Sequence, residues 1–416
     1  MNMNMKRIIL VLVLISCTGL FFATGAAEKV VDKDLVFIND NPPFEQQNIE
    51  MGEWIKERIG VGFVPESYPD LTTYQTTLRQ SLLSSNTAPD FFKWWSNCRL
   101  RPLYEADLLE DVSDIWEEMF SSGVWPRSAA AEVTFDGKQY AFPYHFSHWG
   151  IIYNKHVYKE LGLSVPTTWE EFMNNLEAVK QSGRSGISFT LEGRWQSTLC
   201  WSEVIMKTDA DLYLGLVDGS IKFSDTRSIE AMQNWLRIIS YFPKDLTLPW
   251  GECYPRIISG DYTHALLGDW LLTSLEAEGV DLDKDVGWFP VPAITPAGNG
   301  FVLEISPMVI PKNSRNKEQT KQVMREWMSV EGQKKWVEIF SESSPACGGL
   351  VPDKKIFQSI VDAGLFTDKV RHMPRWYEAV PVELCEYTMD KFGEVILNPS
   401  RLKAVMQEID DFRERM

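Results

Sequence analysis

Short apolar runs alternate with longer amphipathic runs through residues 33–97. The runs typical of strands are residues 33–40 (KDLVFIND), 61–69 (VGFVPESYP) and 88–97 (APDFFKWWSN), and those with helical spacing are residues 48–60 (NIEMGEWIKERIG) and 74–85 (YQTTLRQSLLSS). Gly60 is placed to end the first helix. A β-α-β-α-β order predicts a largely parallel sheet with helices on its faces, and therefore an α/β fold.

Polar and aromatic side chains follow two of these strands. Asn39 and Asp40 end the first strand, and Trp94, Trp95 and Asn97 end the third. Ligands bind at the carboxyl ends of parallel strands, so both groups are candidates for a binding site. Because strand side chains alternate between faces, one tryptophan is expected to face the ligand and the other to pack in the core. Helix capping is the alternative role for Asn39 and Asp40.

Length and charge limit the classes of function. The 416 residues suffice for two lobes, each with its own core. With 41 basic and 58 acidic residues, the formal charge of -17 disfavours nucleic acid and anionic membranes as partners, and a neutral or cationic ligand fits better.

The amino-terminal residues have the composition of an export signal. Lys6 and Arg7 precede an apolar run from Ile8 to Ala23, which is shorter than the roughly 20 residues that a membrane span needs. Cleavage before Glu28 would remove residues 1–27 as a signal peptide and leave a periplasmic protein. Lipid anchoring of Cys17 to the outer face of the cytoplasmic membrane is the alternative.

The cysteines and histidines do not form a metal-binding pattern. Six cysteines lie far apart without a C-x-x-C pair, which indicates isolated thiols with at most one or two disulfides. His145 and His148 have H-x-x-H spacing, but no cysteine or carboxylate stands at a matching distance. We therefore expect neither a metal nor a cofactor.

The rest of the chain continues the mixed pattern. Residues 137–163 predict strands followed by a helix, and residues 165–183 predict a helix capped by Thr167 or Thr168. Further helical or helix-flanked stretches are residues 228–242, 255–279 and 316–340. Residues 372–416 predict helical hairpins.

Several segments together resemble one protein family. The segments are APDFFKWW (88–95), residues 137–163, VPTTWEEF (165–172), SGDYTHALLGDW (259–270), VGWFPVPA (286–293) and residues 316–336. Each is weak alone, but their order over essentially the whole mature chain resembles the extracellular solute-binding proteins, family 1, of ABC importers, the branch that includes maltose-binding proteins.

The resemblance implies a two-lobed periplasmic-binding-protein fold (type II), with hinge segments around a cleft. The N-terminal lobe would comprise residues 28–142 and 292–345, and the C-terminal lobe residues 143–291 and 346–416. The hinges would lie near residues 140–143, 290–292 and 344–346. Such hinges close the lobes around a ligand.

The resemblance also adds candidate ligand contacts. Trp94, Trp95 and Asn97 stand where sugar-binding relatives place contacts, and Trp270 and Trp376 stand where relatives place cleft aromatics. The residues themselves suggest a second set, each with a structural alternative: Glu192 and Trp195 in a loop, Tyr144, His145 and Ser147 after the first hinge, and Glu304 inside an apolar run. Because a buried carboxylate needs partners, Glu304 either contacts the ligand or forms an internal ion pair.

These features predict a binding protein that captures a carbohydrate and delivers it to an ABC permease. Flat aromatic side chains complement the apolar faces of sugar rings. We expect a monomer that binds no nucleic acid and is not an enzyme, since no G-x-S-x-G, phosphate-binding loop or H-E-x-x-H motif occurs. The alternatives are a secreted glycosidase or lyase, and a binding protein for a polyol or glycerol phosphodiester. Asn97, Cys98 and Ser147 depart from the charged contacts of maltose-binding relatives, which disfavours maltodextrin.

Overall fold

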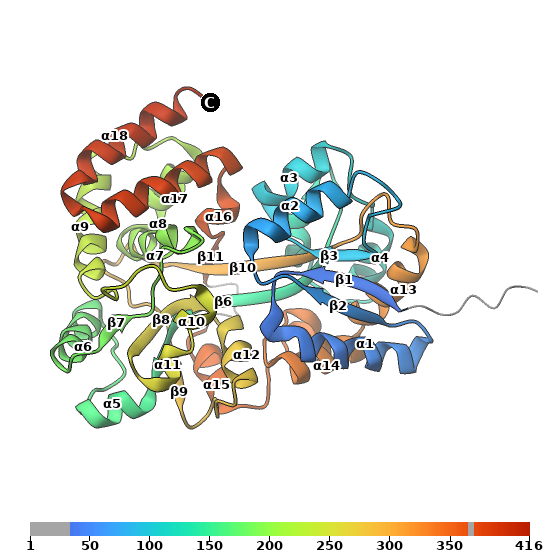
Figure 1. Cartoon of the computed structure of the whole chain (residues 1–416), viewed down its shortest axis with the longest axis horizontal. Coiled ribbons are helices and arrows are strands. Elements are labelled where there is room, and N and C mark those ends of the chain that lie inside the picture. The colour runs from blue at the N-terminus through green and yellow to red at the C-terminus, as the bar shows by residue number, and fades with distance from the viewer. Residues whose placement is uncertain (1–33, 365–369) are drawn as a thin grey trace, which may run out of the picture. The chain divides into compact units, whose positions relative to one another are not determined.

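The computed structural model describes residues 34–364 and 370–416 (Figure 1). The predicted signal peptide and Cys17 lie outside the described residues. No helix in the described part of the chain is long and apolar enough to cross a membrane.

The parallel opening of the fold is present. Strands β2 (Phe63–Ser67) and β3 (Phe91–Lys93) flank β1 (Leu35–Asn39), and both pair with it in parallel. Helix α1 (Glu45–Ile59) connects β1 to β2 and ends at Gly60, whose φ of 81° is a left-handed conformation that glycine adopts without strain. The β-α-β-α-β prediction is therefore confirmed.

Two long antiparallel strands continue this sheet into the other half of the molecule. Strand β10 (Gly300–Val309) pairs with β3 near its end and with β6 (Phe142–Asn154) along most of its length. The far end of the sheet is formed by β8 (Tyr262–Gly268) and β7 (Ser185–Ile187), so the strand order is β2-β1-β3-β10-β6-β8-β7. Two further strands of this sheet are β9 (Val286–Phe289), which pairs with β6, and β11 (Arg371–Met373), which pairs with β10.

The helices gather around the two ends of the sheet and form two lobes (Figure 1). The N-terminal lobe also contains η1 (Pro42–Phe44), α2 (Leu71–Ser81), α3 (Asn97–Glu105), α4 (Ser113–Ser121), η2 (Arg127–Val133), β4 (Thr134–Phe135), β5 (Lys138–Gln139), α13 (Lys317–Met328) and α14 (Val330–Phe340). The C-terminal lobe contains α5 (Lys155–Leu161), α6 (Trp169–Gln181), η3 (Trp195–Thr198), α7 (Leu199–Thr208), α8 (Ala210–Asp218), α9 (Thr226–Ile239), α10 (Trp250–Cys253), α11 (Arg256–Ser259), α12 (Trp270–Ala277), α15 (Lys355–Asp362), α16 (Trp376–Ala379), α17 (Val382–Leu397), η5 (Pro399–Arg401) and α18 (Leu402–Arg413).

The chain passes between the lobes along β6, along β10 and through the residues after α14, which include η4 (Ala346–Gly348). The predicted lobe boundary at residues 142 and 143 falls at the start of the unbroken strand β6. The prediction assigns residues 294–298 to the N-terminal lobe. In the structure, however, the backbone N–H of Ile294 donates to the carbonyl oxygen of Lys207 on α7, which belongs to the C-terminal lobe. The residue boundaries of the lobes stay a prediction.

Local signals outside the sheet also hold, with one exception. The side chain of Thr168 caps α6 and Glu171 completes a capping box, as the sequence predicts. Helices α17 and α18 form the predicted hairpin at the carboxyl end. The prediction of helix from residue 372 is wrong at its start, because residues up to Met373 pair with β10 as strand β11. The cysteines in the described residues are free thiols.

Candidate functional site

The carboxyl end of β1 holds two of the predicted site residues. The amide oxygen of Asn39 accepts from the backbone N–H of Asn41, while its Nδ2 is buried without a partner among the described residues. The carboxylate of Asp40 forms an ion pair with Lys93, 3.0 Å from Nζ to Oδ1. Buried amide donors normally have an acceptor, so Asn39 has unused hydrogen-bonding capacity at the strand edge where a ligand would bind.

The adjacent tryptophans Trp94 and Trp95 follow β3 and are both buried. Trp94 is 1% exposed and donates from Nε1 to the carbonyl oxygen of Arg99 at 2.9 Å, so it packs in the lobe. Trp95 is 6% exposed, and its ring lies below the Lys93 ammonium at 4.2 Å. The ring of Trp95 also meets the ring of Tyr377 at 5.7 Å, which places Trp95 at the contact between the lobes.

Tyr377 of α16 receives several contacts from the N-terminal lobe. Arg99 lies over its ring and donates from Nε to its carbonyl oxygen at 3.1 Å, and Gln75 Nε2 donates to its hydroxyl at 3.3 Å. Arg99 also pairs with Glu386 of α17 at 2.9 Å. Nη2 of Arg99 has no hydrogen-bond partner in the described residues. The contact is therefore both aromatic and ionic.

Three half-buried indoles gather on the C-terminal lobe. Trp250 meets Trp195 at 5.4 Å and Trp270 at 6.1 Å between ring centroids, in edge-to-face arrangements. They come from η3, α10 and α12, which are far apart in sequence. Partly exposed aromatic rings provide the flat apolar surface that a sugar ring needs. This group, Trp195, Trp250 and Trp270, is called the indole cluster below.

The carboxylate of Glu304 lies beside this cluster. Its Oε2 accepts from the indole nitrogens of Trp149 and Trp270, each at 3.0 Å. Its Oε1 lies 3.1 Å from Nη2 of Arg375, which also pairs with Glu378. Of the two predicted alternatives for Glu304, the structure contains the internal ion pair.

His145 lies in a buried cluster of polar side chains where the lobes meet. Nδ1 of His145 lies 2.7 Å from Oε2 of Glu342, and Oε1 of Glu342 accepts from Thr273 at 3.3 Å. Burial lowers the pKa of His145 to about 3, and burial together with the charge of Asp269 holds the pKa of Glu342 well above its usual range. Both shifts favour the neutral form of each group, because burial penalises charge. Nε2 of His145 has no partner among the described residues.

The remaining predicted residues lie in different surroundings. Tyr144 is in the core of the N-terminal lobe and donates to Asn48 at 3.0 Å, and Ser147 is fully buried opposite Glu304. Asn97 is half-buried at the start of α3, and Glu192 is exposed. Trp376 is 0% exposed. It packs against Trp201, Tyr213 and Phe223, so it is a core residue of the C-terminal lobe.

Sequence reasoning missed four residues near the site. They are Lys93, Trp250, Arg375 and Tyr377. Trp250 follows a proline in the segment LTLPWGE, a signal that a tryptophan begins a short helix, and Arg375 and Tyr377 flank the predicted Trp376. Lys93 directly precedes the tryptophan pair. Lys93, Arg375 and Tyr377 each stand next to a predicted site residue, whereas Trp250 lies between the segments that the sequence analysis singled out.

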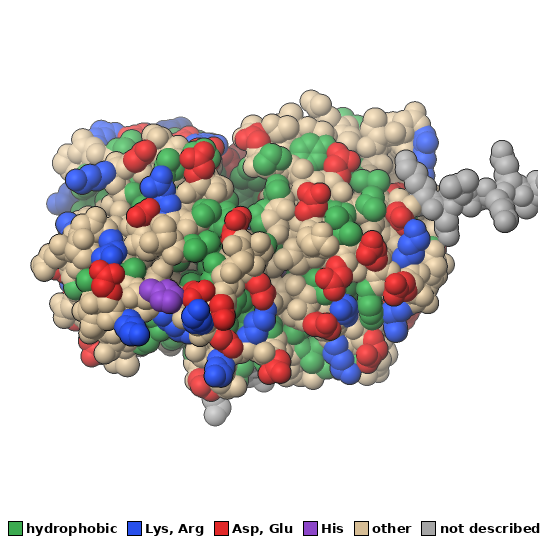
Figure 2. Space-filling model, turned by 60° about the horizontal axis from the view of Figure 1, so that its bottom comes forward, with side chains coloured by type: hydrophobic (Ala, Val, Ile, Leu, Met, Phe, Trp, Pro, Cys, Tyr) green, Lys and Arg blue, Asp and Glu red, His purple; other side chains and the backbone are tan. Residues whose placement is uncertain are grey.

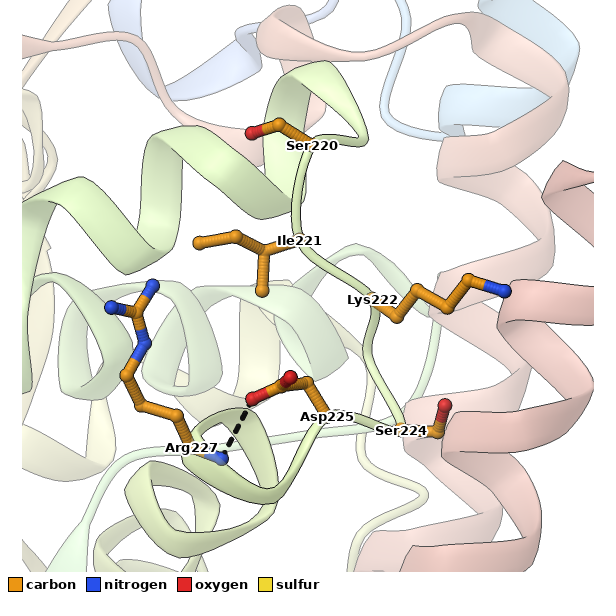
Figure 3. Close-up of a pocket in the computed structure, with 6 residues that line it drawn as sticks. All are labelled: Ser220, Ile221, Lys222, Ser224, Asp225 and Arg227. Atoms are coloured by element: carbon orange, nitrogen blue, oxygen red, sulfur yellow. Dashed lines mark hydrogen bonds between the residues drawn. The ribbon is translucent and has the colours of Figure 1, made fainter.

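The space-filling view supports a recess between the lobes. Figure 2 shows a hollow between the two halves of the displayed face, with hydrophobic side chains along it. A separate cavity of about 490 Å³ lies on the C-terminal lobe and is lined by Ser220, Ile221, Lys222, Ser224, Asp225 and Arg227 (Figure 3). Its charged groups have partners within the protein, since Asp225 caps α9 and Lys222 pairs with Glu414. None of the predicted site residues lines it.

No metal centre competes with this site in the described part of the chain, where no group of three or more His, Cys, Asp or Glu side chains is placed to hold an ion.

Comparison with known proteins identifies the family. The family described as "Bacterial extracellular solute-binding protein" matches residues 52–334. The diacetylchitobiose binding protein DasA of Streptomyces coelicolor is 23% identical over 288 residues, which cover 67% of this chain and 63% of DasA. The matched region thus spans slightly less than two thirds of that relative.

Solved structures share the fold. The bacterial solute receptor AcbH, described with an exclusive preference for β-D-galactopyranose, has a TM-score of 0.82 at 16% identity, covering 92% of this chain and 99% of AcbH. A chitin oligosaccharide binding protein has a TM-score of 0.77 at 18% identity, with 92% and 98% covered. The two-lobed α/β fold is therefore that of solute receptors, as the resemblance in sequence implies. The family match covers more than half of the residues, and the chain belongs to the bacterial extracellular solute-binding proteins.

Proposed function

We propose that this protein is the substrate-binding component of an ABC importer and captures a carbohydrate between its two lobes. The observation that carries the proposal is the indole cluster, in which three half-buried rings from distant segments adjoin one another. A sugar ring stacked on such a surface places its apolar C–H faces against the indoles and removes apolar area from water. The sugar-binding names of the relatives support the same ligand class.

Polar groups of the N-terminal lobe would complete the site. Asn39 and Arg99 each have a buried donor atom that finds no acceptor among the described residues, and sugar hydroxyls can accept from both. Lys93 contacts two further candidates: its ammonium group forms an ion pair with Asp40 and lies over the ring of Trp95. Asn97, Trp195, Glu192 and His145 stay proposed contacts, whereas Trp94, Tyr144, Ser147 and Trp376 fit a structural role better because they pack in the interior.

Delivery to a permease requires that the ligand favour the closed form. A ligand that binds open and closed forms equally shifts nothing, so contacts from both lobes must form together. We propose hinge movement along β6, β10 and the residues after α14, with lobe boundaries near residues 142, 291 and 345. The closed monomer, exported to the periplasm or anchored through Cys17, would then dock on the membrane subunits.

Sugar titration tests the proposal. Intrinsic tryptophan fluorescence and thermal shift would be followed with D-galactose, diacetylchitobiose, other neutral sugars, polyols and a glycerol phosphodiester. A saturable response with micromolar affinity, about 8 kcal/mol, is expected from one sugar class. Trp270→Ala should abolish the response, whereas Trp116→Phe, a substitution in the core of the N-terminal lobe, should retain it. A response only to a phosphodiester, or to no solute, would overturn carbohydrate binding.

Binding without turnover is part of the proposal. Incubation with chromogenic glycosides should release no product. Release that survives repurification and disappears on substitution of a single carboxylate would instead identify a glycosidase or lyase.

A further inference from the structure

The carboxylate of Glu304 is surrounded by donors from four segments of the chain. Oε2 accepts from Trp149 on β6 and from Trp270 at the start of α12, each at 3.0 Å. Oε1 pairs with Arg375 at 3.1 Å and accepts from the hydroxyl of Ser306 at 3.4 Å. Glu304 is 6% exposed. Both oxygens are therefore occupied by the protein, which leaves little capacity for a direct ligand contact.

Gly268 makes the convergence of the two indoles possible. It pairs with Trp149 across strands β6 and β8, two residues before Trp270. A Cβ atom at this position would lie 2.6 Å from Nε1 of Trp270 and 3.0 Å from Nε1 of Trp149. The absence of a side chain thus lets both N–H groups reach the same carboxylate oxygen.

Of these two indoles, only Trp270 has a partly exposed ring. Trp149 is 2% exposed and packs inside the C-terminal lobe, while Trp270 belongs to the half-buried indole cluster. A hydrogen bond from the indole nitrogen restricts rotation of the ring about its side-chain bonds. The bond to Glu304 therefore sets the plane in which Trp270 presents its face.

We propose that Glu304 is a positioning residue, which fixes the ring of Trp270 for stacking on a sugar and does not itself contact the ligand. The sugar in this statement rests on the proposed function. The control of Trp270 by Glu304 is a property of the protein without ligand, and the two parts can be tested separately.

The experiment compares three variants by indole N–H resonances and by affinity. Glu304→Met keeps the volume but removes both acceptor oxygens, whereas Glu304→Gln retains one acceptor oxygen for the indoles. Glu203→Gln, at a fully buried carboxylate on α7, is the matched control. The indole resonances are recorded on the ligand-free protein, with Trp149→Phe and Trp270→Phe as assignments. Affinity is measured with D-galactose and diacetylchitobiose.

Glu304→Met should move the resonances of both Trp149 and Trp270 and weaken sugar binding by at least about tenfold. Glu304→Gln should restore most of the affinity, to within about threefold of the parent, because an amide oxygen can still accept. Glu203→Gln should change neither the two resonances nor the affinity. If the negative charge of Glu304 served only to stabilise the fold, Glu304→Met and Glu304→Gln would weaken sugar binding equally.

Three outcomes would overturn the inference. The first is an unchanged Trp270 resonance in Glu304→Met, and the second is failure of Glu304→Gln to restore binding. The third is that Trp270→Phe, which lacks only the indole N–H donor and part of the ring, binds sugar as tightly as the parent. This third outcome can be tested even if the Glu304 variants do not fold. If the parent binds no sugar, the proposed function fails, but the resonances still decide whether Glu304 controls Trp270.

Discussion

The guanidinium group of Arg99 lies over the ring of Tyr377, 3.6 Å from the ring centroid, and joins the two lobes. Nε of Arg99 donates to the carbonyl oxygen of Tyr377 at 3.1 Å, and Nη1 donates to Glu386 at 2.9 Å. Arg99 belongs to α3 of the N-terminal lobe, whereas Tyr377 and Glu386 belong to α16 and α17. This contact exists only while the lobes lie together.

Arg99→Ala should shift the protein toward an open form. A charge-assisted hydrogen bond contributes about 1.5–3 kcal/mol, so the affinity for sugar should fall by about tenfold or more. With sugar present, small-angle X-ray scattering should show a larger radius of gyration for Arg99→Ala than for the parent. Arg99→Lys should give an intermediate loss, because lysine keeps the charge but cannot stack and donate in one plane. Equal scattering and affinity in parent and Arg99→Ala would show that the contact does not stabilise closure.

Trp270 and Trp376 should respond differently to truncation. Trp376 is fully buried and donates to Thr388 at 2.9 Å, so Trp376→Ala should lower the free energy of unfolding by about 3–5 kcal/mol. Trp270 is half-buried, so Trp270→Ala should cost less stability but abolish sugar binding. Urea unfolding and sugar titration would be measured on both variants. Loss of stability without loss of binding in Trp270→Ala would place this ring in the core.

The local parts of the fold could be predicted from the sequence, and the long-range parts could not. Gly60 and the Thr168–Glu171 capping box end or begin helices through contacts within a few residues, which a sequence pattern contains. Strand β6 is buried at every residue, so it has no alternation to indicate which face or which partner it has.

The same limit applies to the candidate site. The sequence identified Trp270 and Glu304 separately but not their hydrogen bond, because 34 residues separate them. The environment of Trp376 was also out of reach, since its neighbours Trp201 and Phe223 come from distant segments. Residue type indicates what a side chain can do, whereas packing decides whether it is exposed to do it.

Gly268→Ala should disturb the site without a general loss of folding. The added Cβ would lie 2.6 Å from the Trp270 indole, so the ring must move away from Glu304 and sugar affinity should fall by at least about tenfold. Gly393→Ala is the control, because its Cβ meets only Leu191 at 3.9 Å and alanine favours the helix α17 by about 0.5–1 kcal/mol. Calorimetric titration measures the affinities. Similar affinities in both variants would show that the indole geometry at Gly268 does not matter for binding.

His264 should make stability depend on pH on the acidic side. Its Nδ1 lies 2.6 Å from the carbonyl oxygen of Gly186, and its Nε2 lies 2.8 Å from the hydroxyl of Tyr158, so the buried ring is held neutral. Burial lowers the pKa of His264 to about 4, below the 6.5 of an exposed histidine.

Between pH 6.5 and 4 the unfolded chain therefore binds a proton at His264 that the folded protein does not. The free energy of unfolding then falls as the pH falls through this window, by about 3 kcal/mol for this one residue. Above pH 6.5 its contribution is constant. Chemical denaturation at a series of pH values should show the fall in the parent and a flatter profile in His264→Gln, which keeps hydrogen-bonding groups but does not titrate. An equally steep profile in this variant would assign the acid sensitivity to other buried groups such as His145, whose pKa is lowered in the same direction.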